Sequence, residues 1–362
     1  MISRRTFMTQ LSCSLLFAKT VLSESGKPSE RFPYPGKYIS RFCKELQPVG
    51  RVLELKETYV WCNSPTLGPD GKIHLFFSRW PAKYGMGGWI HKCEIARAVA
   101  DSPEGPYHVA ETVLAPRGEG YWDGTTCHNP HIQVVDGKYC LFYMGNSNGK
   151  THTKRIGLAI ADSPEGPWHR PDEPLLDPGP EGAWDDHCTT NPAFIKHPNG
   201  QYWLYYKSWN TAEHEAARGK SIRGNRKYGL AIADSLQGPY IKHPDNPLID
   251  FSGGKANEQL EDAYVWIEKG HIKLIARDMG FFDHNVGLIF ESRDGIHWPQ
   301  PEIAYFAADH YIDQPPAPPH LKRYNRFERP QLLMQDGKPT HLFTTSQGGT
   351  YMTATPFIFK IL

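Results

Sequence analysis

Polar side chains open several short apolar runs of this 362-residue chain. The runs that share this feature read "WCNSPTL" (61–67), "CHNPHI" (127–132), "TTNPAFI" (189–195), "LEDAYVW" (260–266) and "FERPQLL" (327–333). A polar group at the start of a buried strand costs free energy unless it is paired or used. Carboxylates and histidines that face one site can support acid–base chemistry. The candidates of this kind are Glu261, Asp262 and His128 and, just upstream of two runs, Asp123 in "YWDG" and Asp186 in "AWDD".

Amide and cationic side chains accompany these groups. Asn63, Asn129 and Asn191 stand near the start of three of the runs. Three cations, Arg79, Lys207 and Arg277, stand at the end of the predicted strand that follows a run. A fourth, Arg329, stands within the last run. A guanidinium fork fits a carboxylate or a sulfate, so these cations predict an anionic ligand. The alternative is that each cation pairs with a neighbouring carboxylate.

A repeated phrase indicates which elements position these groups. It reads "ARAVADSPEGPY" (96–107), "LAIADSPEGPW" (158–168), "LAIADSLQGPY" (230–240) and "LIFESRDGIHW" (288–298). A second marker is a tight-turn tetrapeptide whose glycine recurs at nearly regular intervals, at Gly71, Gly137, Gly200, Gly270 and Gly337. Asp-Gly and Asn-Gly pairs predict hairpins because both turn residues must tolerate positive φ.

Each turn lies between two strand-like runs, the repeated phrase adds a third strand, and a short apolar run adds a fourth. Periodic four-stranded units around a channel make a β-propeller. The sequence therefore predicts an all-β fold, a five-bladed β-propeller of four-stranded antiparallel blades, in which "RVLEL" (51–55) completes the fifth blade. The aromatic residue that ends each phrase is predicted to pack between blades, at Tyr107, Trp168, Tyr240 and Trp298.

The tight turns are predicted on one face of the propeller. The long loops and the polar strand starts are predicted on the other face, where binding groups concentrate. The charged insert 210–227 lies among these loops, and we expect it to overhang the site.

Net charge and hydropathy exclude some classes of partner. The formal net charge is +1, so no global field favours nucleic acid or an anionic membrane. No apolar run approaches the ~20 residues that a membrane helix needs. We expect no nucleic-acid partner and no membrane span.

The first residues resemble a twin-arginine export signal, with Ser3-Arg4-Arg5-Thr6-Phe7 ahead of an apolar stretch. Residues 1–25 are the predicted signal, 26–362 are a single catalytic propeller domain, and the expected location is the periplasm or exterior of a bacterium. The remaining cysteines match no disulfide framework, so both disulfides and buried thiols stay open. They are Cys43, Cys62, Cys93, Cys127, Cys140 and Cys188.

The stretches "WDD…NPAFIKHPNGQYWLYY" and "EDAYVW", with the "ADSPEGPW" hairpins, resemble the five-bladed glycoside hydrolases of families 43, 32 and 117. The resemblance covers nearly all of 26–362. It implies a carbohydrate partner and hydrolysis of an O-glycosyl bond. It also implies one divalent, calcium-like cation at the channel axis, held by aspartate or water.

Family 43 places an aspartate base on the first blade, a modulating aspartate on the third and a glutamate acid on the fourth. By position, the acid falls on Glu261. Asn191 stands at the third-blade position, and Asn63 and Ser64 stand at the first. Two of the three family carboxylates are therefore replaced, which indicates a divergent member with a moved base.

The resemblance and the residues together predict Glu261 as the general acid. The neighbouring Asp262 and partial burial both raise a carboxyl pKa, as a general acid needs. The predicted base is Asp123 or Asp186, with Asp262 as a further choice and His128 as an alternative proton carrier.

The predicted function is an exported glycoside hydrolase that acts at the end of an oligosaccharide, with a two-carboxylate mechanism. The cations suggest an oligosaccharide from an anionic polysaccharide. Trp80 and other tryptophans on the same face could stack on sugar rings, although packing is their commoner role. Two alternatives stay open: a carbohydrate-binding propeller without catalysis, which the replaced aspartates support, and a glycoside phosphorylase whose cations hold phosphate.

Overall fold

The predicted hairpin turns are present in the computed structural model, which describes residues 34–220, 223–252 and 258–362. Their glycines adopt positive φ, from 73° at Gly337 to 93° at Gly200, a region that costs glycine nothing. Each turn follows the end of a strand whose start carries the polar residues described above. The turns therefore lie at the opposite ends of these strands from Glu261, as predicted. The predicted export signal, 1–25, lies outside the described residues.

The strands form groups of antiparallel neighbours within the compact unit Lys37–Leu362. The first group comprises β2 (Thr58–Leu67), β3 (Ile73–Pro81), β4 (Glu94–Ala100) and β5 (His108–Leu114). The second comprises β6 (Thr126–Val135), β7 (Lys138–Asn146) and β8 (Arg155–Ala161). The third comprises β9 (Thr190–Lys196), β10 (Tyr202–Ser208), β11 (Lys227–Ala233) and β12 (Ile241–Lys242). The fourth comprises β13 (Gln259–Glu268), β14 (His271–Met279), β15 (Gly287–Ser292) and β16 (Glu302–Tyr305).

The fifth group takes one strand from the other end of the sequence. Its members are β17 (Glu328–Gln335), β18 (Lys338–Gly348), β19 (Thr353–Ile361) and β1 (Leu46–Arg51). β1 pairs antiparallel with β19. The sequence assigned this role to 51–55, which is wrong except at Arg51. The chain leaves the sheet there because Leu53 is buried in the core between the first and fifth groups.

The second group departs from the predicted four strands. In place of a fourth strand, isolated bridges join His169 to Ile160 and Leu176 to Ile156. This part of the chain is rich in proline, which cannot donate to a strand ladder. The prolines are Pro167, Pro171, Pro174, Pro178 and Pro180.

Helices are few and short in the part of the chain that the structure describes. α1 (Arg41–Lys44) precedes β1, and α2 (Thr211–Ala216) lies in the predicted insert. The 3₁₀ turns are η2 (Gly36–Tyr38), η3 (Ala82–Tyr84), η4 (Met86–Ile90), η5 (Thr151–Thr153) and η6 (Ala308–His310). None of the described helices is long and apolar enough to cross a bilayer.

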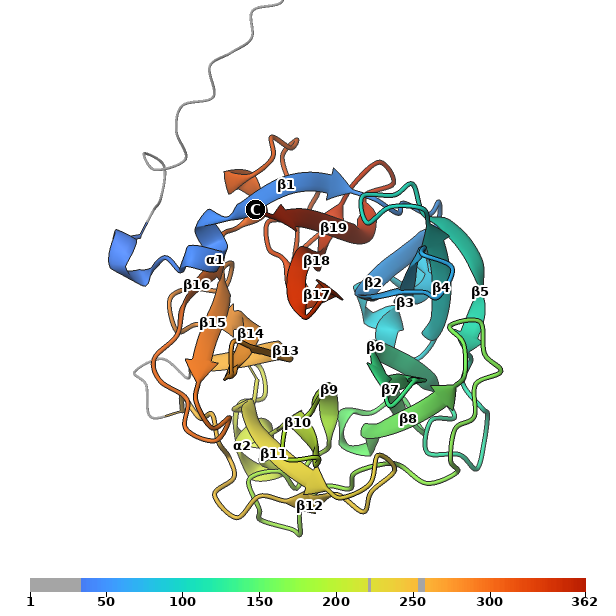
Figure 1. The fold of residues 1–362 in the computed structure, drawn as a ribbon, viewed down its shortest axis with the longest axis vertical. Helices are drawn as coiled ribbons and strands as arrows, with labels where there is room; N and C mark the ends of the chain where they lie inside the picture. Colours follow the sequence, from blue (N-terminus) through green and yellow to red (C-terminus); the bar gives the residue numbers. More distant parts are fainter. Residues whose placement is uncertain (1–33, 221–222, 253–257) are drawn as a thin grey trace, which may run out of the picture. The chain divides into compact units, whose positions relative to one another are not determined.

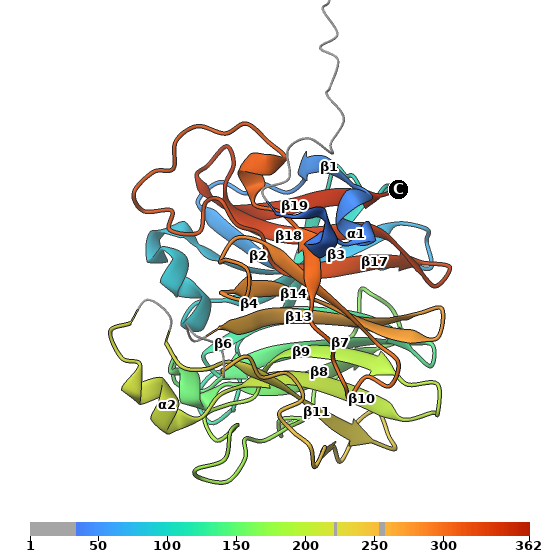
Figure 2. The same ribbon diagram turned by 90° about the vertical axis from the view of Figure 1, so that its left-hand side faces the viewer.

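The first strand of each group lies around a common centre (Figure 1). Contacts run from β2 to β6, from β6 to β9, from β9 to β13, from β13 to β17 and back from β17 to β2. No hydrogen-bonded sheet among the described residues closes on itself. We call these five the inner strands. Figure 2 shows the strands from the side, with α2 clear of them.

Hydrophobic side chains fill the spaces between neighbouring groups. The aromatic residues that end the repeated phrase take part, as predicted. Trp168 packs edge-on against Phe76 of the first group, and Trp298 packs against Tyr205 of the third. Tyr107 lies in the core with residues of the fifth group, and Tyr240 lies with residues of the second. The core is thus a set of layers that joins each group to its neighbour.

The cysteines of the described region are all free and buried. Burial raises the pKa of Cys127 to about 12, and the reactive form of a cysteine is its thiolate. In a variant with Cys13→Ser, we expect Ellman's reagent to label no thiol of the native protein and all of them after denaturation. Rapid labelling of the native variant would contradict this burial.

Candidate functional site

A β-bulge near the start of every inner strand positions the candidate site. The pairing register shifts at these points, for example between Glu261 and Tyr264 of β13. Within each bulge one residue has a left-handed backbone, with φ from 50° to 62°. These residues are Cys62, Asn129, Asn191, Asp262 and Arg329. Residues other than glycine rarely adopt this backbone conformation outside functional or constrained sites.

The residues just before the bulge residues line one cavity, which we call the central cavity. These are Trp61, His128, Thr190, Glu261 and Glu328. Its volume is about 160 Å³. Two positions after each bulge residue, buried side chains fill the axis, namely Ser64, His131, Ala193, Tyr264 and Gln331. The central cavity is therefore closed beneath.

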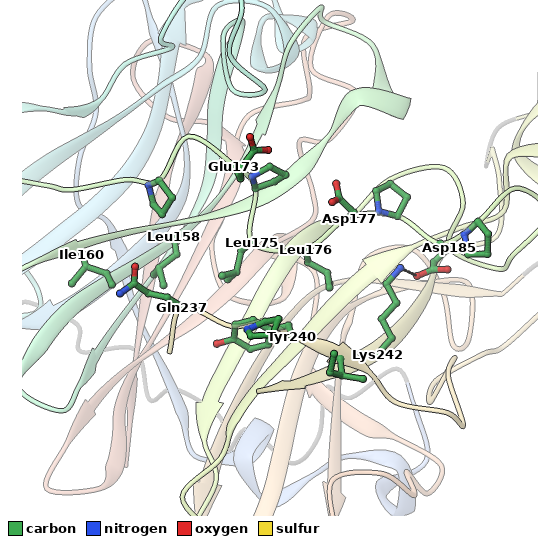
Figure 3. A pocket seen from close by; sticks show the side chains of 17 residues that line it. Leu158, Ile160, Glu173, Leu175, Leu176, Asp177, Asp185, Gln237, Tyr240 and Lys242 are labelled. Atoms are coloured by element: carbon green, nitrogen blue, oxygen red, sulfur yellow. Dashed lines mark ion pairs between the residues drawn. The ribbon is translucent and has the colours of Figure 1, made fainter. Parts of the chain in front are cut away.

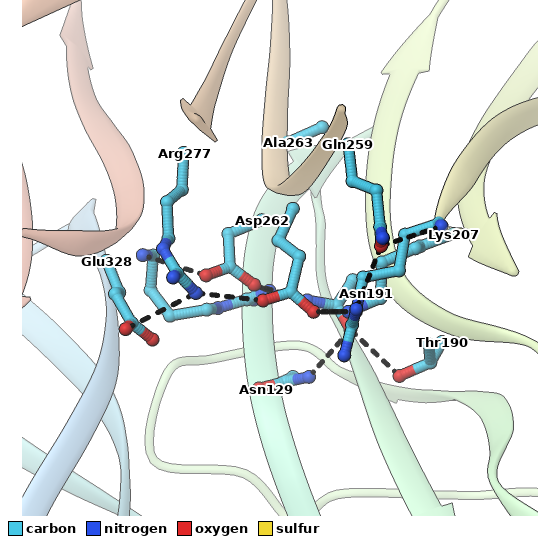
Figure 4. A network of polar contacts seen from close by, with 12 residues as sticks. Asn129, Thr190, Asn191, Lys207, Gln259, Asp262, Ala263, Arg277 and Glu328 are labelled. Atoms are coloured by element: carbon cyan, nitrogen blue, oxygen red, sulfur yellow. Dashed lines mark hydrogen bonds and ion pairs between the residues drawn. The ribbon is translucent and has the colours of Figure 1, made fainter. Parts of the chain in front are cut away.

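Hydrogen bonds link the bulge residues from one group to the next, and Figure 4 shows the part of this chain that includes Asn129, Asn191 and Asp262. The Cys62 thiol donates to Asn129 Oδ1 at 3.0 Å, and Asn129 Nδ2 donates to Asn191 Oδ1 at 3.2 Å. Asn191 Nδ2 donates to Asp262 Oδ1 at 2.5 Å, and Arg329 donates to the same oxygen at 3.2 Å. This chain of contacts satisfies polar groups that burial would otherwise penalise.

Glu261 lies among three cations. Its carboxylate is 2.7 Å from Lys207 Nζ, 2.5 Å from Arg226 Nε and 2.9 Å from a terminal nitrogen of Arg277. The Arg226 contact is an ion pair without hydrogen-bond alignment. Burial alone would raise the pKa of Glu261, but Arg226, Lys207 and Arg277 outweigh it and hold the pKa well below its usual range. The expected raised pKa is therefore wrong, because the charges nearest to Glu261 are cations.

Glu328 is a second carboxylate in the same register. The Arg277 nitrogen that contacts Glu261 also lies 3.3 Å from Glu328 Oε1, so one guanidinium bridges the two carboxylates. Arg323 and Arg326 contact Glu328 as well. Burial raises the pKa of Glu328, but these arginines reverse the effect and lower it.

His128 lines the central cavity with a buried imidazole. Its ring stacks on Trp89, with ring centroids 5.4 Å apart, and its Nδ1 lies 3.2 Å from Cys93 Sγ. Burial, followed by nearby cations such as Arg329 and Lys154, holds the pKa of His128 well below its usual range. The imidazole is therefore neutral at neutral pH.

The structure brings together most of the predicted site. Besides Glu261 and His128, the central cavity is lined by Asn129, Asn191, Lys207, Asp262 and Arg329. Arg277 joins them through its ion pair with Glu261.

The structure separates Asp123 and Asp186 from Glu261, and neither lines the central cavity. Asp123 is fully buried and contacts Arg117, Arg170 and the Tyr143 hydroxyl. Asp186 accepts hydrogen bonds from the backbone of Gly182 and Thr211, which is a loop-capping role.

Three of the predicted binding residues also serve structure. Arg79 pairs with Glu94 at 2.8 Å, outside the central cavity. Trp80 is buried, stacks on Tyr59 and touches the His128 ring edge-on. Asn63 is buried and bonds to the backbone of Thr344. For Arg79 this is the alternative in which a cation pairs with a neighbouring carboxylate.

Several lining residues were not among the predicted site residues. Lys154 and Arg323 stand on loops without a repeat signature, so no pattern marked them. His214 and Arg226 come from the insert 210–227, which therefore contributes to the cavity wall; its residues 221–222 lie outside the described part. Glu328 had a signal, because it opens its run in the same register as Glu261.

The axis below the central cavity does not fit the divalent cation that the family resemblance implies. His131 Nδ1 contacts Gln331 Oε1 at 3.0 Å, and its Nε2 accepts the backbone N–H of Phe194 at 3.1 Å. Ser64 also donates to Gln331. Calcium requires six to eight oxygen ligands, usually with carboxylates, and these polar groups already bond to each other. No group of three or more potential ligand side chains in the described residues is arranged around a metal position.

A larger cavity, of about 750 Å³, lies between the second and third groups (Figure 3). Its lining is mainly proline and aliphatic, with Leu158, Ile160 and Leu175. Lys242 and Asp185 form an ion pair at 2.6 Å there. Its lining has no carboxylate pair bridged by a cation, so the central cavity is the candidate site.

No family model matches the chain. Two uncharacterized proteins of Mycobacterium tuberculosis, MT1551 of strain CDC 1551 / Oshkosh and Rv1502 of strain H37Rv, are 24% identical to it over 196 residues. The match covers 51% of this chain and 61% of each relative, so the chain spans less than two thirds of the relatives' length.

The fold is similar to those of glycoside hydrolases. Zg3597, a family 117 glycoside hydrolase of the marine bacterium Zobellia galactanivorans, has a TM-score of 0.63 and 19% identity, with 87% of this chain and 90% of that chain covered. CoXyl43, a GH43 beta-xylosidase/alpha-arabinofuranosidase from a compost metagenome, has a TM-score of 0.57 and 15% identity, with 87% and 93% covered. The predicted resemblance to families 117 and 43 is confirmed at the level of the fold.

Proposed function

We propose that the protein is a glycoside hydrolase on a five-bladed β-propeller, with the central cavity as its active site. The observation that carries the proposal is the pair Glu261 and Glu328, which open neighbouring inner strands and share Arg277. Two carboxyl groups at one cavity are the usual means of hydrolysing a glycosidic bond. The fold shared with hydrolases of families 117 and 43 supports the same proposal.

In this proposal Glu261 acts as an ionised carboxylate. Three cations favour its charged form. In that form it can activate a water molecule or stabilise the positive charge that develops on the sugar. The proton for the leaving oxygen then has another source, so the acid role expected from the sequence is replaced.

The dimensions and charge of the central cavity support the finer proposals. It is small and closed beneath, which favours the end of an oligosaccharide over the middle of a polymer. Its lining holds more cations than carboxylates, which favours an anionic sugar. The lining cations are Lys154, Lys207, Arg226, Arg323 and Arg329, and the carboxylates are Glu261, Asp262 and Glu328.

Carbohydrate binding without hydrolysis is the second candidate. The observation in its favour is that Glu261, Asp262 and Glu328 are all paired with cations. The lowered pKa values of Glu261 and Glu328 mean that neither is held protonated as a general acid requires.

The test is a screen of the purified full chain against defined neutral and acidic oligosaccharides, with and without phosphate. We expect release of one monosaccharide from the chain end, at a rate independent of phosphate. Binding without any product would favour the second candidate. Release of a sugar phosphate only in the presence of phosphate would identify a phosphorylase.

We also propose export through a twin-arginine route into the periplasm or the medium. Ser3-Arg4-Arg5-Thr6-Phe7 supports this. Fractionation of cells that express the full chain tests it, and retention of the protein in the cytoplasm would contradict it.

A further inference from the structure

Most cations that line the central cavity have a carboxylate partner. Lys207 and Arg226 pair with Glu261, Arg329 pairs with Asp262, and Arg323 pairs with Glu328. Lys154 differs, because no carboxylate of residues 34–220, 223–252 or 258–362 forms an ion pair with it. It is the lining cation whose charge the protein leaves uncompensated.

Lys154 is also deeply buried, with an exposed fraction of 4%. Its Nζ lies 4.4 Å from the centroid of the Trp209 ring and 5.9 Å from that of the Trp89 ring. Aromatic faces attract a cation but do not replace the hydrogen bonds that an ammonium makes in water. A buried ammonium without a counter-charge is costly, so an anionic partner from outside the chain would stabilise it.

His214 provides a second observation at the same place. Its ring lies against the same Trp209, with ring centroids 5.5 Å apart. The imidazole lines the central cavity, and its buried Nδ1 has no hydrogen-bond partner. A proton on Nδ1 would make this atom a hydrogen-bond donor at the wall of the central cavity, which Lys154 also lines.

We propose that Lys154 and His214 form a subsite, against Trp209, for a negatively charged oxygen group of the ligand. A carboxylate and a sulfate ester share the chemistry that this subsite recognises, since both accept hydrogen bonds from an ammonium and from an N–H. This inference deepens the proposed function, and it rests on that proposal for one point, namely that the ligand is a sugar. Binding can be measured without turnover, so the two can fail separately.

The test is calorimetric titration of the full chain with methyl glucuronide, glucose 6-sulfate and the neutral methyl glucoside. We expect the wild-type protein to prefer an acidic sugar over the neutral one, and the preferred acid identifies carboxylate or sulfate. Lys154→Met should weaken binding of that acid by about ten- to a hundredfold, the usual effect of losing one charged hydrogen bond. Lys154→Arg should keep most of the affinity, and His214→Phe should lose a smaller part.

The matched control is Lys150→Met, which removes a charge from an exposed residue of the same loop and should leave binding unchanged. Equal affinity of wild type for acidic and neutral sugars would overturn the proposal. So would unchanged acid binding by a folded Lys154→Met variant. Turnover of neutral sugars without a preference for anionic ones would contradict the anion subsite and support the proposed hydrolase. A preference for anionic sugars without turnover would support the subsite and contradict the proposed hydrolase.

A pH titration of the wild type keeps the test available if Lys154→Met does not fold. Burial and the nearby cations Lys207 and Arg226 lower the pKa of Lys154, whereas Cys188 and Glu261 raise it. The net result is a pKa of about 8. The pKa of the facing His214 is lowered to about 4 by burial, so His214 does not titrate near pH 8. Affinity for the acidic sugar should therefore fall as pH rises through about 8, because the ammonium loses its charge. Constant affinity up to about pH 10, near the ordinary pKa of lysine, would contradict the role of Lys154.

Discussion

Replacing Glu261 by glutamine is expected to lower the rate of glycoside hydrolysis by about 10²–10⁴-fold. The change keeps the shape of the side chain and removes the negative charge that Lys207, Arg226 and Arg277 surround. Because the carboxylate is ionised in the free protein, it cannot serve as the proton donor for the leaving group. We therefore expect the loss to be similar for substrates with good and with poor leaving groups, measured as kcat/KM on matched glycosides.

Glu94→Gln is the matched control for this experiment. Glu94 is also a glutamate paired with an arginine, Arg79, but it lies outside the central cavity. This variant should retain wild-type kcat/KM. If Glu261→Gln slows only the substrates with poor leaving groups, Glu261 is the general acid after all. If it slows neither, the carboxylate pair is not catalytic.

The largest effect on stability is expected from Asp123→Asn. Asp123 is fully buried, and its carboxylate is 2.6 Å from Arg117 Nε and 3.1 Å from Arg170. Removing one partner of a buried ion pair leaves uncompensated charge and typically costs about 3–5 kcal/mol. We expect a loss of this size in the free energy of unfolding, measured by urea denaturation, with kcat per folded molecule unchanged.

Asp172→Asn provides the comparison, because Asp172 contacts the same Arg117 but its side chain is 80% exposed. That change should alter the free energy of unfolding by no more than about 0.5 kcal/mol. A variant Asp123→Asn that is as stable as wild type yet inactive would instead support the catalytic base first predicted from the sequence.

The sequence predicted the repeat architecture because the repeats carry strong local signals. Gly137 and Gly270 mark turns that require positive φ, and Trp168 marks a hairpin that packs on the preceding group. The missing fourth strand of the second group was also visible in principle, since Pro171 and Pro174 interrupt it. The repeat pattern alone predicts four strands in every blade and gives these prolines no weight.

The site was harder to predict than the fold, and Asp123 shows why. Asp123 in "YWDG" and Asp185 in "AWDD" each follow a tryptophan ahead of an inner strand, and their position alone does not distinguish a catalytic carboxylate from a structural one. In the structure each carboxylate accepts a hydrogen bond from a tyrosine in the second strand of its group, Tyr143 of β7 or Tyr206 of β10. Recurrence in two repeats therefore marks a shared structural contact here, and it does not by itself identify a catalytic group.

Lys154 could not be predicted from the sequence as a residue of the site. It follows η5 on a loop, and neither its burial nor its lack of a carboxylate partner is visible in the sequence. Only the tertiary packing of Trp89 and Trp209 around it shows that it faces the central cavity.

The pairing of β1 with β19 has a consequence for the order in which the protein can be completed. Leu46 lies opposite Ile361, so β1 cannot pair until β19, far later in the chain, has been synthesised. Closing so long a stretch of chain costs entropy and slows folding. A nascent chain that stops before Thr353 offers β1 no hydrogen-bonding neighbour among the described strands and leaves Tyr59 of β2 without its parallel partner, Ala354. Any step that demands the finished fold must therefore wait until β19 has been synthesised.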